Sequence, residues 1–238
     1  MTTYILLFSA AYVSAAVSGA AGFGGALLLL PLLVATVGVT QAVPLLTIAQ
    51  FTGNISRAGF GFSQIHWKPV GLFLAAAVPM SASGALAFVE LPKDFVTRSI
   101  GAVILLFVTL KYFGIVRLHE GTALLLIGGG LVGFLSGLVG SAGPLGAAVF
   151  LSLELSPVAY VASEAITALV IHGVKTVVYL KYIFIDRNFW VLAGIMSIAM
   201  VLGTWSSKRI IERMSPKSFQ RFVTVLLVLI ASYMVING

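Results

Sequence analysis

Three polar side chains interrupt an apolar stretch that runs from residue 43 to residue 62. Gln50, Asn54 and Arg57 follow one another at i, i+4 and i+7, which places them on one face of a helix. Amide and guanidinium groups donate hydrogen bonds that suit oxygen-rich anions, and the guanidinium adds positive charge. The spacing therefore predicts an anion-binding face on this helix.

A second apolar stretch carries Glu164, His172 and Lys175, and aligning the two stretches places Lys175 on Arg57 and His172 on Asn54. A basic residue inside a membrane helix costs about 2.5–3.5 kcal/mol, so such residues are usually functional. A cation at the same place in both stretches favours binding over simple snorkelling to the membrane surface. Glu164 has two interpretations: pairing with Lys175 through an intermediary, or binding a coupling proton or sodium ion. His172 has two as well, a substrate contact and a structural hydrogen bond.

Two glycine-rich segments precede these stretches, "SGAAGFGG" from Ser18 and "SGLVGSAGPLG" from Ser136. Irregular backbone at membrane depth leaves N–H groups unpaired, which is tolerated only inside protein or beside a water-filled cavity. Helix N-termini carry positive partial charge and free donors, so they bind anions. We therefore predict backbone contacts to an anion from the turn residues Gly22, Gly24, Gly25, Gly140 and Gly143, and a hydroxyl contact from Ser141.

Close helix packing is the alternative use of these glycines, because small residues let membrane helices approach one another. We favour packing for residues 128–133, and Gly133 forms a small-xxx-small pair with Gly137. Dinucleotide binding by the first segment would need a βαβ unit, which the sequence lacks.

The composition indicates a lipid environment. Of the 238 residues, 60% are hydrophobic and 9% are charged, whereas a soluble domain has roughly 25% charged residues. Repeated apolar stretches of about 20 residues predict an all-α polytopic membrane protein and not a β-barrel. The net charge of +7 lies mostly in short loops, as the positive-inside rule expects, so we predict no nucleic-acid partner. Because there is no cysteine, disulfides and thiolate metal sites are excluded.

The chain reads as two homologous repeats, residues 1–117 and 118–238. "SGAAGFGGALLLLPLL" at Ser18 aligns with "SGLVGSAGPLGAAVFL" at Ser136, and the polar-bearing stretches align at the same offset. Each repeat is expected to have two short helices around its glycine turn and then three full spans. The predicted short helices are 4–17, 26–37, 122–135 and 145–155, and the predicted spans are 43–62, 69–89, 95–113, 157–183, 189–207 and 219–236.

Two topologies fit this pattern. Helices of about 12 to 15 residues rise only ~18–22 Å, so each short helix ends within a hydrocarbon core of ~30 Å. Either each short pair is a re-entrant hairpin and the second repeat is inverted, or each pair is one broken crossing and the repeats are parallel. The distribution of basic loop residues favours hairpins, with both termini outside the cytoplasm. The first segment is expected to be retained, because no basic region or clear cleavage site accompanies it.

The twofold unit, with "GAAGFGG" leading into "LLLLPLL" and then a polar-bearing span, resembles the TauE/SafE family of membrane anion transporters. The resemblance covers nearly the whole chain. It implies about eight hydrophobic segments and export of sulfite, organosulfonates or other small anions. The second turn departs from the pattern, because Ser141-Ala142 stands where the first turn has Phe23-Gly24.

These observations predict a secondary transporter, an exporter, of a small sulfur oxyanion such as sulfite or an organosulfonate. It would lie in a bacterial-type inner membrane, as a multi-pass protein without cofactor or metal. The sequence does not decide between a monomer and a homodimer. The site would combine the glycine turns with Gln50, Asn54, Arg57, His172 and Lys175, and rocking of one repeat against the other would expose it alternately. An anion channel, a transporter of another small anion and a non-transporting scaffold are the alternatives. An enzyme is disfavoured, because no Gly-x-Ser-x-Gly, His-Glu-x-x-His or paired aspartates are present.

Overall fold

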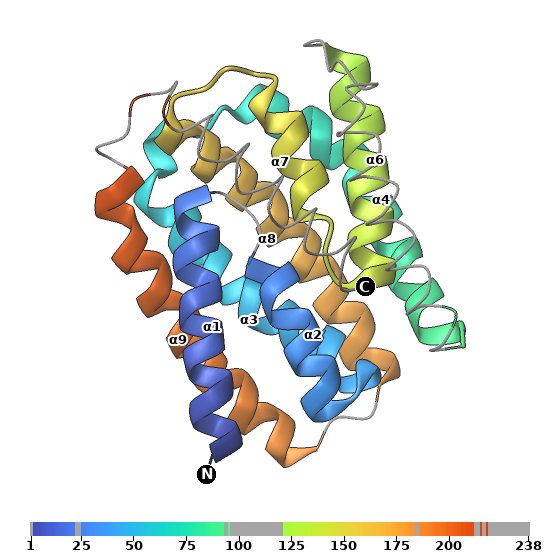
Figure 1. Ribbon diagram of the computed structural model, residues 1–238. Coiled ribbons are helices and arrows are strands. Elements are labelled where there is room, and N and C mark those ends of the chain that lie inside the picture. The colour runs from blue at the N-terminus through green and yellow to red at the C-terminus, as the bar shows by residue number, and fades with distance from the viewer. Residues whose placement is uncertain are drawn as a thin grey trace.

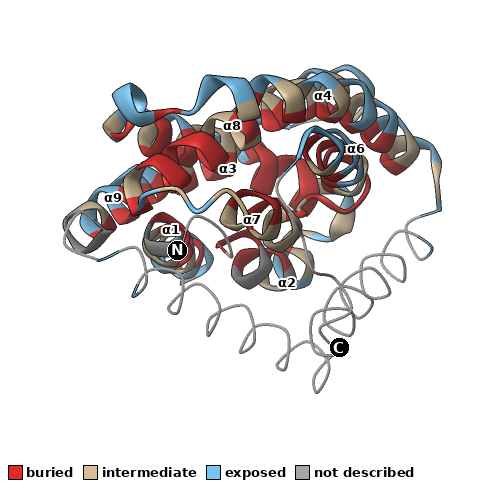
Figure 2. Cartoon of the chain, turned by 90° about the horizontal axis from the view of Figure 1, so that it is seen from above, coloured by how far each residue is buried: buried red, intermediate tan, exposed pale blue. Residues whose placement is uncertain are grey.

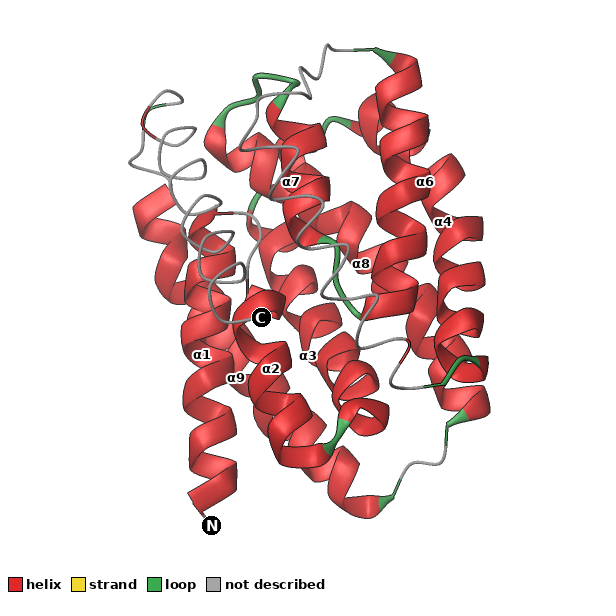
Figure 3. Ribbon diagram, turned by 45° about the vertical axis from the view of Figure 1, so that its right-hand side comes forward, coloured by secondary structure: helices red, strands yellow, loops and turns green. Residues whose placement is uncertain are grey.

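The computed structural model describes residues 2–21, 25–92, 95, 121–183, 186–211, 215 and 218. Within this part of the chain there are eight α-helices, one short 3₁₀ helix and no strand (Figure 3). The helices are α1 (Thr2–Ala21), α2 (Gly25–Val37), α3 (Val39–Phe60), η1 (Phe62–Gln64), α4 (Trp67–Glu90), α6 (Thr122–Val139), α7 (Gly143–Leu151), α8 (Pro157–Tyr182) and α9 (Arg187–Ile211). The predicted spans 95–113 and 219–236 lie almost entirely outside the described residues, as do Gly22 and Gly24.

Four of these helices are long and apolar enough to cross a bilayer: α4, α6, α8 and the 187–208 part of α9. Their outer faces carry large apolar side chains, among them Ile127, Val177 and Trp205, which are 64%, 70% and 70% exposed. Many exposed apolar side chains on several helices are unfavourable in water and suit contact with lipid. The described chain therefore has the all-helical architecture of a polytopic membrane protein.

The first helix of each glycine-broken pair is longer than the sequence predicts. α1 has 20 residues and α6 has 18, because both continue through glycines expected to end them. Gly19 and Gly137 lie inside these helices, where a Cβ would collide with Ser207 and with the backbone of Ser81 respectively. These two glycines serve close packing, and the second break comes later, at Gly140. α2 agrees with its prediction, and α7 is a short helix of 9 residues.

The outer helices pack as two pairs on either side of a central crossing. α1 lies along α9, and α4 lies along α6, while α3 and α8 contact each other between the pairs (Figure 1). α3 also contacts α9, and α8 contacts α4. Buried residues concentrate where these helices face one another (Figure 2). The central helices α3 and α8 are thus the elements that carry side chains into the interior.

Glycines bring α4 and α6 into unusually close contact. A Cβ on Gly129 would meet the backbone of Phe73, and a Cβ on Gly133 would meet the backbone of Ala77. The packing interpretation of Gly133 and Gly137 is therefore confirmed.

Replacing Gly133 with alanine is expected to destabilise the folded protein by about 1–3 kcal/mol, the usual cost of overpacking a closely packed contact. The matched control is Gly130→Ala on the same helix, where a Cβ would meet its nearest atoms at an ordinary 3.8 Å. Thermal unfolding of the purified protein in detergent should show a lower midpoint for Gly133→Ala alone. Equal midpoints would contradict the packing interpretation.

Candidate functional site

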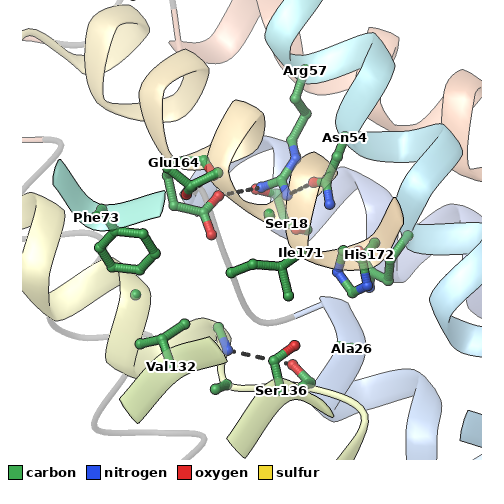
Figure 4. Close-up of a pocket in the computed structure, with 17 residues that line it drawn as sticks. Ser18, Ala26, Asn54, Arg57, Phe73, Val132, Ser136, Glu164, Ile171 and His172 are labelled. Atoms are coloured by element: carbon green, nitrogen blue, oxygen red, sulfur yellow. Dashed lines mark hydrogen bonds and ion pairs between the residues drawn. The ribbon is translucent and has the colours of Figure 1, made fainter. Parts of the chain in front are cut away.

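A cavity with polar and apolar lining lies where α3 and α8 meet the end of α6 and the start of α7 (Figure 4). The space between its lining residues is about 510 Å³ when the open mouth is counted. Its lining residues come from seven helices and one turn: Ser18, Ala26, Gln50, Asn54, Arg57, Phe73, Val132, Ser136, Ser141, Ala142, Gly143, Gly146, Glu164, Thr167, Ala168, Ile171 and His172. A mixed polar and apolar lining at the centre of a membrane protein is typical of a site for a small polar solute.

Arg57 is the cation of this cavity, and it is only 4% exposed. Its Nη1 donates to the main-chain oxygen of Ser18 at 3.2 Å, and its Nη2 donates to Asn54 Oδ1. Nη1 also lies 3.4 Å from Glu164 Oε2, in an ion pair between α3 and α8. Figure 4 shows the guanidinium between Asn54 and Glu164. A carbonyl, an amide and a carboxylate therefore fix the position of this charge.

Glu164 pairs with Arg57 and not with Lys175, which is the partner that the sequence prediction considered. The reason is geometric: α8 crosses α3, so the two polar faces meet across the helices and not along one of them. Within the described chain, Oε2 of Glu164 makes no hydrogen bond in addition to this ion pair.

Three buried nitrogen atoms around the cavity have no hydrogen-bond partner among the described residues: Gln50 Nε2, Asn54 Nδ2 and His172 Nδ1. The orientation of the Asn54 amide is fixed, because a guanidinium only donates and so must face Oδ1. The free atom of Asn54 is consequently an N–H donor. A buried donor without a partner costs about 1–3 kcal/mol, so Asn54 Nδ2 marks a place prepared for an acceptor.

The turn between α6 and α7 forms one wall of the cavity. Gly140 has φ +85°, a left-handed conformation that glycine adopts without strain. Ser141 Oγ accepts from the main-chain nitrogen of Gly143 at 3.4 Å, and α7 begins at Gly143 against the cavity. The N-terminal end of α7 therefore adds positive partial charge to this wall.

Lys175 has a different environment and does not line the cavity. Its side chain is fully buried, and its ammonium donates to the main-chain oxygens of Ser136 and Gly140 at 3.1 and 2.9 Å and to Ser136 Oγ at 3.0 Å. An ammonium group has three donors, so these contacts use all of them. One turn further along α8, Tyr179 donates from its hydroxyl to the main-chain oxygen of Gly137 at 2.5 Å.

Arg57 and Lys175 thus share one role. Each donates to a main-chain oxygen 39 residues earlier, Ser18 for Arg57 and Ser136 for Lys175. Both acceptors lie in the last turn of a helix, where carbonyl groups lack partners within the helix and the helix dipole is negative. Each cation therefore satisfies carbonyls at the end of a helix inside the membrane.

Residues 7–234 match the family described as Sulfite exporter TauE/SafE, which covers nearly the whole chain. The chain belongs to the TauE/SafE sulfite exporter family. No curated protein and no solved structure matches it. Family membership makes this TauE/SafE protein a multi-pass membrane transporter of small sulfur-containing anions.

Seven of the residues predicted for the site line the cavity of this TauE/SafE protein: Gln50, Asn54, Arg57, Ser141, Gly143, Glu164 and His172. Gly25, Gly140 and Lys175 do not line it; Gly25 packs against Ser14 and Ser18. Sequence reasoning did not assign Phe73, Gly146 or Thr167 to the site. Thr167 follows Glu164 at i+3 and is the one with a usable signal, since that spacing puts a second polar side chain on the same helix face.

Proposed function

We propose that this TauE/SafE protein is a secondary exporter of a small sulfur oxyanion, sulfite or an organosulfonate, and that the cavity at Arg57 is its binding site. The observation that carries the proposal is a set of nitrogen atoms, those of Gln50, Asn54 and His172, that have no hydrogen-bond partner among the described residues and surround one buried guanidinium. Several oxygens of one anion would accept hydrogen bonds from these groups together. The guanidinium would offset the cost of moving the anion out of water.

A second proposal concerns the organisation of the chain. We propose that residues 1–117 and 118–238 are homologous repeats with the second inverted. The matching contacts of Arg57 and Lys175 support the homology of the repeats, as does the exchange of helix pairs, because α1 packs with α9 while α6 packs with α4. α1 of the first repeat corresponds to α6 of the second, and α4 corresponds to α9. Exchanging the repeats therefore turns the α1–α9 pair into the α6–α4 pair.

Export is the direction that the membrane potential favours. A potential that is negative inside assists the exit of an anion by about 2.3 kcal/mol per charge per 100 mV. Opposed movements of the two outer helix pairs would open the central cavity to each side in turn.

Purified protein in liposomes tests the proposal through uptake of labelled sulfite, with ethanesulfonate, sulfate and thiosulfate as competitors. We expect saturable flux of sulfite and accelerated exchange when unlabelled sulfite is present on the opposite side. Arg187→Gln, which removes an exposed arginine, should keep the flux. Flux without acceleration by opposite-side anion would indicate a channel, and absence of any anion flux would contradict the proposal.

A further inference from the structure

Glu164 places a negative charge inside a cavity whose other polar groups suit an anion. Its side chain is 7% exposed, and its charge partner is Arg57, the same group that the proposed cargo would need. An acid at this position repels a bound anion, so its presence calls for an explanation beyond positioning Arg57. The inference below rests on the proposed function, because it concerns how the same site handles charge.

The carboxylate of Glu164 is held loosely. The 3.4 Å between Oε2 and Arg57 Nη1 exceeds the 2.7–2.9 Å typical of a charge-assisted hydrogen bond. Oε2 has no hydrogen bond within the described residues, and Oε1 lies on the side of Gly146, which lines the cavity. By contrast, Ser18 and Asn54 hold Arg57 through hydrogen bonds. Of these three contacts of Arg57, the carboxylate is therefore the one that can be exchanged for another anion at least cost.

We propose that Glu164 is a tethered competitor of the cargo, and that its carboxylate takes up one proton from water when an anion binds to Arg57. Transport of each anion is thereby coupled to one proton, so the membrane potential acts only on the charge that an anion carries beyond −1, as in divalent sulfite. The anion replaces the carboxylate as the counter-charge of the guanidinium, and the carboxyl group becomes neutral where it is. The net charge of the cavity is then the same for an empty site and for a site holding a monovalent anion.

The ionisable groups around Glu164 support the proposal that the net charge of the cavity stays constant. Arg57 on α3 is the cation that faces it, and Tyr160 and His172 are the titratable groups of its own helix near the cavity. Among the described lining residues, α1, α2, α4, α6 and α7 contribute no ionisable side chain. Lys175 is turned away toward Ser136 and Gly140. A bound anion and an ionised Glu164 would thus share one cation at low dielectric, which strongly favours neutralising one of them.

Calorimetry of anion binding tests the inference. Binding of ethanesulfonate to the purified protein is measured in two buffers with different protonation enthalpies, which gives the number of protons taken up. This probe keeps its charge from about pH 6 to pH 9, whereas sulfite titrates in that range. The wild type should take up about one proton per anion. In the pH range where a full proton is taken up, its affinity for the anion should fall about tenfold for each unit by which the pH rises. Glu164→Gln should bind without proton uptake and without this pH dependence.

Two controls separate the possible sources of the proton. Glu90→Gln, which neutralises an exposed acid on α4, and His172→Gln should both keep the proton uptake at saturating anion. Loss of uptake in His172→Gln, with uptake retained in Glu164→Gln, would overturn the inference. If only sulfite binds, changes in its own protonation also contribute to the measured proton uptake. Subtracting the uptake of Glu164→Gln from the uptake of the wild type removes this contribution.

The wild-type measurement is decisive even if Glu164→Gln fails to fold. Anion binding without proton uptake would overturn the role of Glu164 and leave the proposed function standing. Absence of binding by any of the anions would instead refute the proposed function, and the inference with it.

Discussion

Replacing Arg57 with glutamine is expected to weaken anion binding at least about thirtyfold. Truncating one member of a buried, hydrogen-bonded charge pair costs about 2–5 kcal/mol in binding systems. Arg57 is the ionised donor of the cavity, and it also holds the Asn54 amide in its orientation. The measurement is the Kd for sulfite or ethanesulfonate in detergent or nanodiscs, with Arg187→Gln as the matched control at an exposed position.

The same substitution should also affect folding, and a double variant separates the two effects. Arg57→Gln leaves the buried Glu164 without its cation, which typically costs about 3–5 kcal/mol of stability. Adding Glu164→Gln removes that unpaired charge, so the double variant should recover much of the unfolding midpoint. It should not recover the wild-type Kd. A double variant that is stable and binds the anion normally would show that Arg57 is a structural residue.

Replacing Lys175 with methionine should destabilise the protein by at least about 2 kcal/mol, because buried acceptors without partners cost about 1–3 kcal/mol each. The ammonium satisfies Ser136 twice and Gly140 once. Methionine matches the length of the lysine stem but donates nothing to them. Thermal or denaturant unfolding measures the effect, and Lys181→Met, an exposed lysine on the same helix, is the control.

The two cations should respond differently to loss of Glu164. Because Lys175 donates to carbonyl and hydroxyl oxygens, Glu164→Gln should not restore the stability of Lys175→Met. The Kd of the fraction that folds should change far less than in Arg57→Gln. A large loss of affinity with unchanged stability in Lys175→Met would place Lys175 in direct contact with the cargo.

Much of the candidate site was predictable, because helical spacing is a local property. The i, i+4, i+7 pattern brought Gln50, Asn54 and Arg57 to one cavity. The short length of α2 also followed from the sequence. What decided these features was the period of the helix and the cost of polar groups in lipid, and both can be read from one segment at a time.

The remaining features depend on contacts between distant segments. His172 and Lys175 lie at i and i+3 on one helix, yet His172 lines the cavity and Lys175 does not. The difference arises from where α6 ends against α8, which no local pattern records. Likewise, the pairing of Glu164 with Arg57 depends on how α8 crosses α3. From the sequence, Gly137 could either end a helix or allow a second helix to pack closely. The close approach of α4 shows that it allows close packing.

The pairing of α1 with α9 bears on how the protein is made. α1 is the first of the described helices to leave the ribosome, while the helix that it packs along begins only at Arg187. Gly203 of α9 approaches the main-chain oxygen of Tyr12 so closely that a side chain there would collide. α1 must therefore remain in the membrane without its packing partner α9 until most of the chain has been synthesised. Such distant contacts form late and slowly, so a nascent chain that stalls before α9 leaves its oldest helix unassembled and open to quality control.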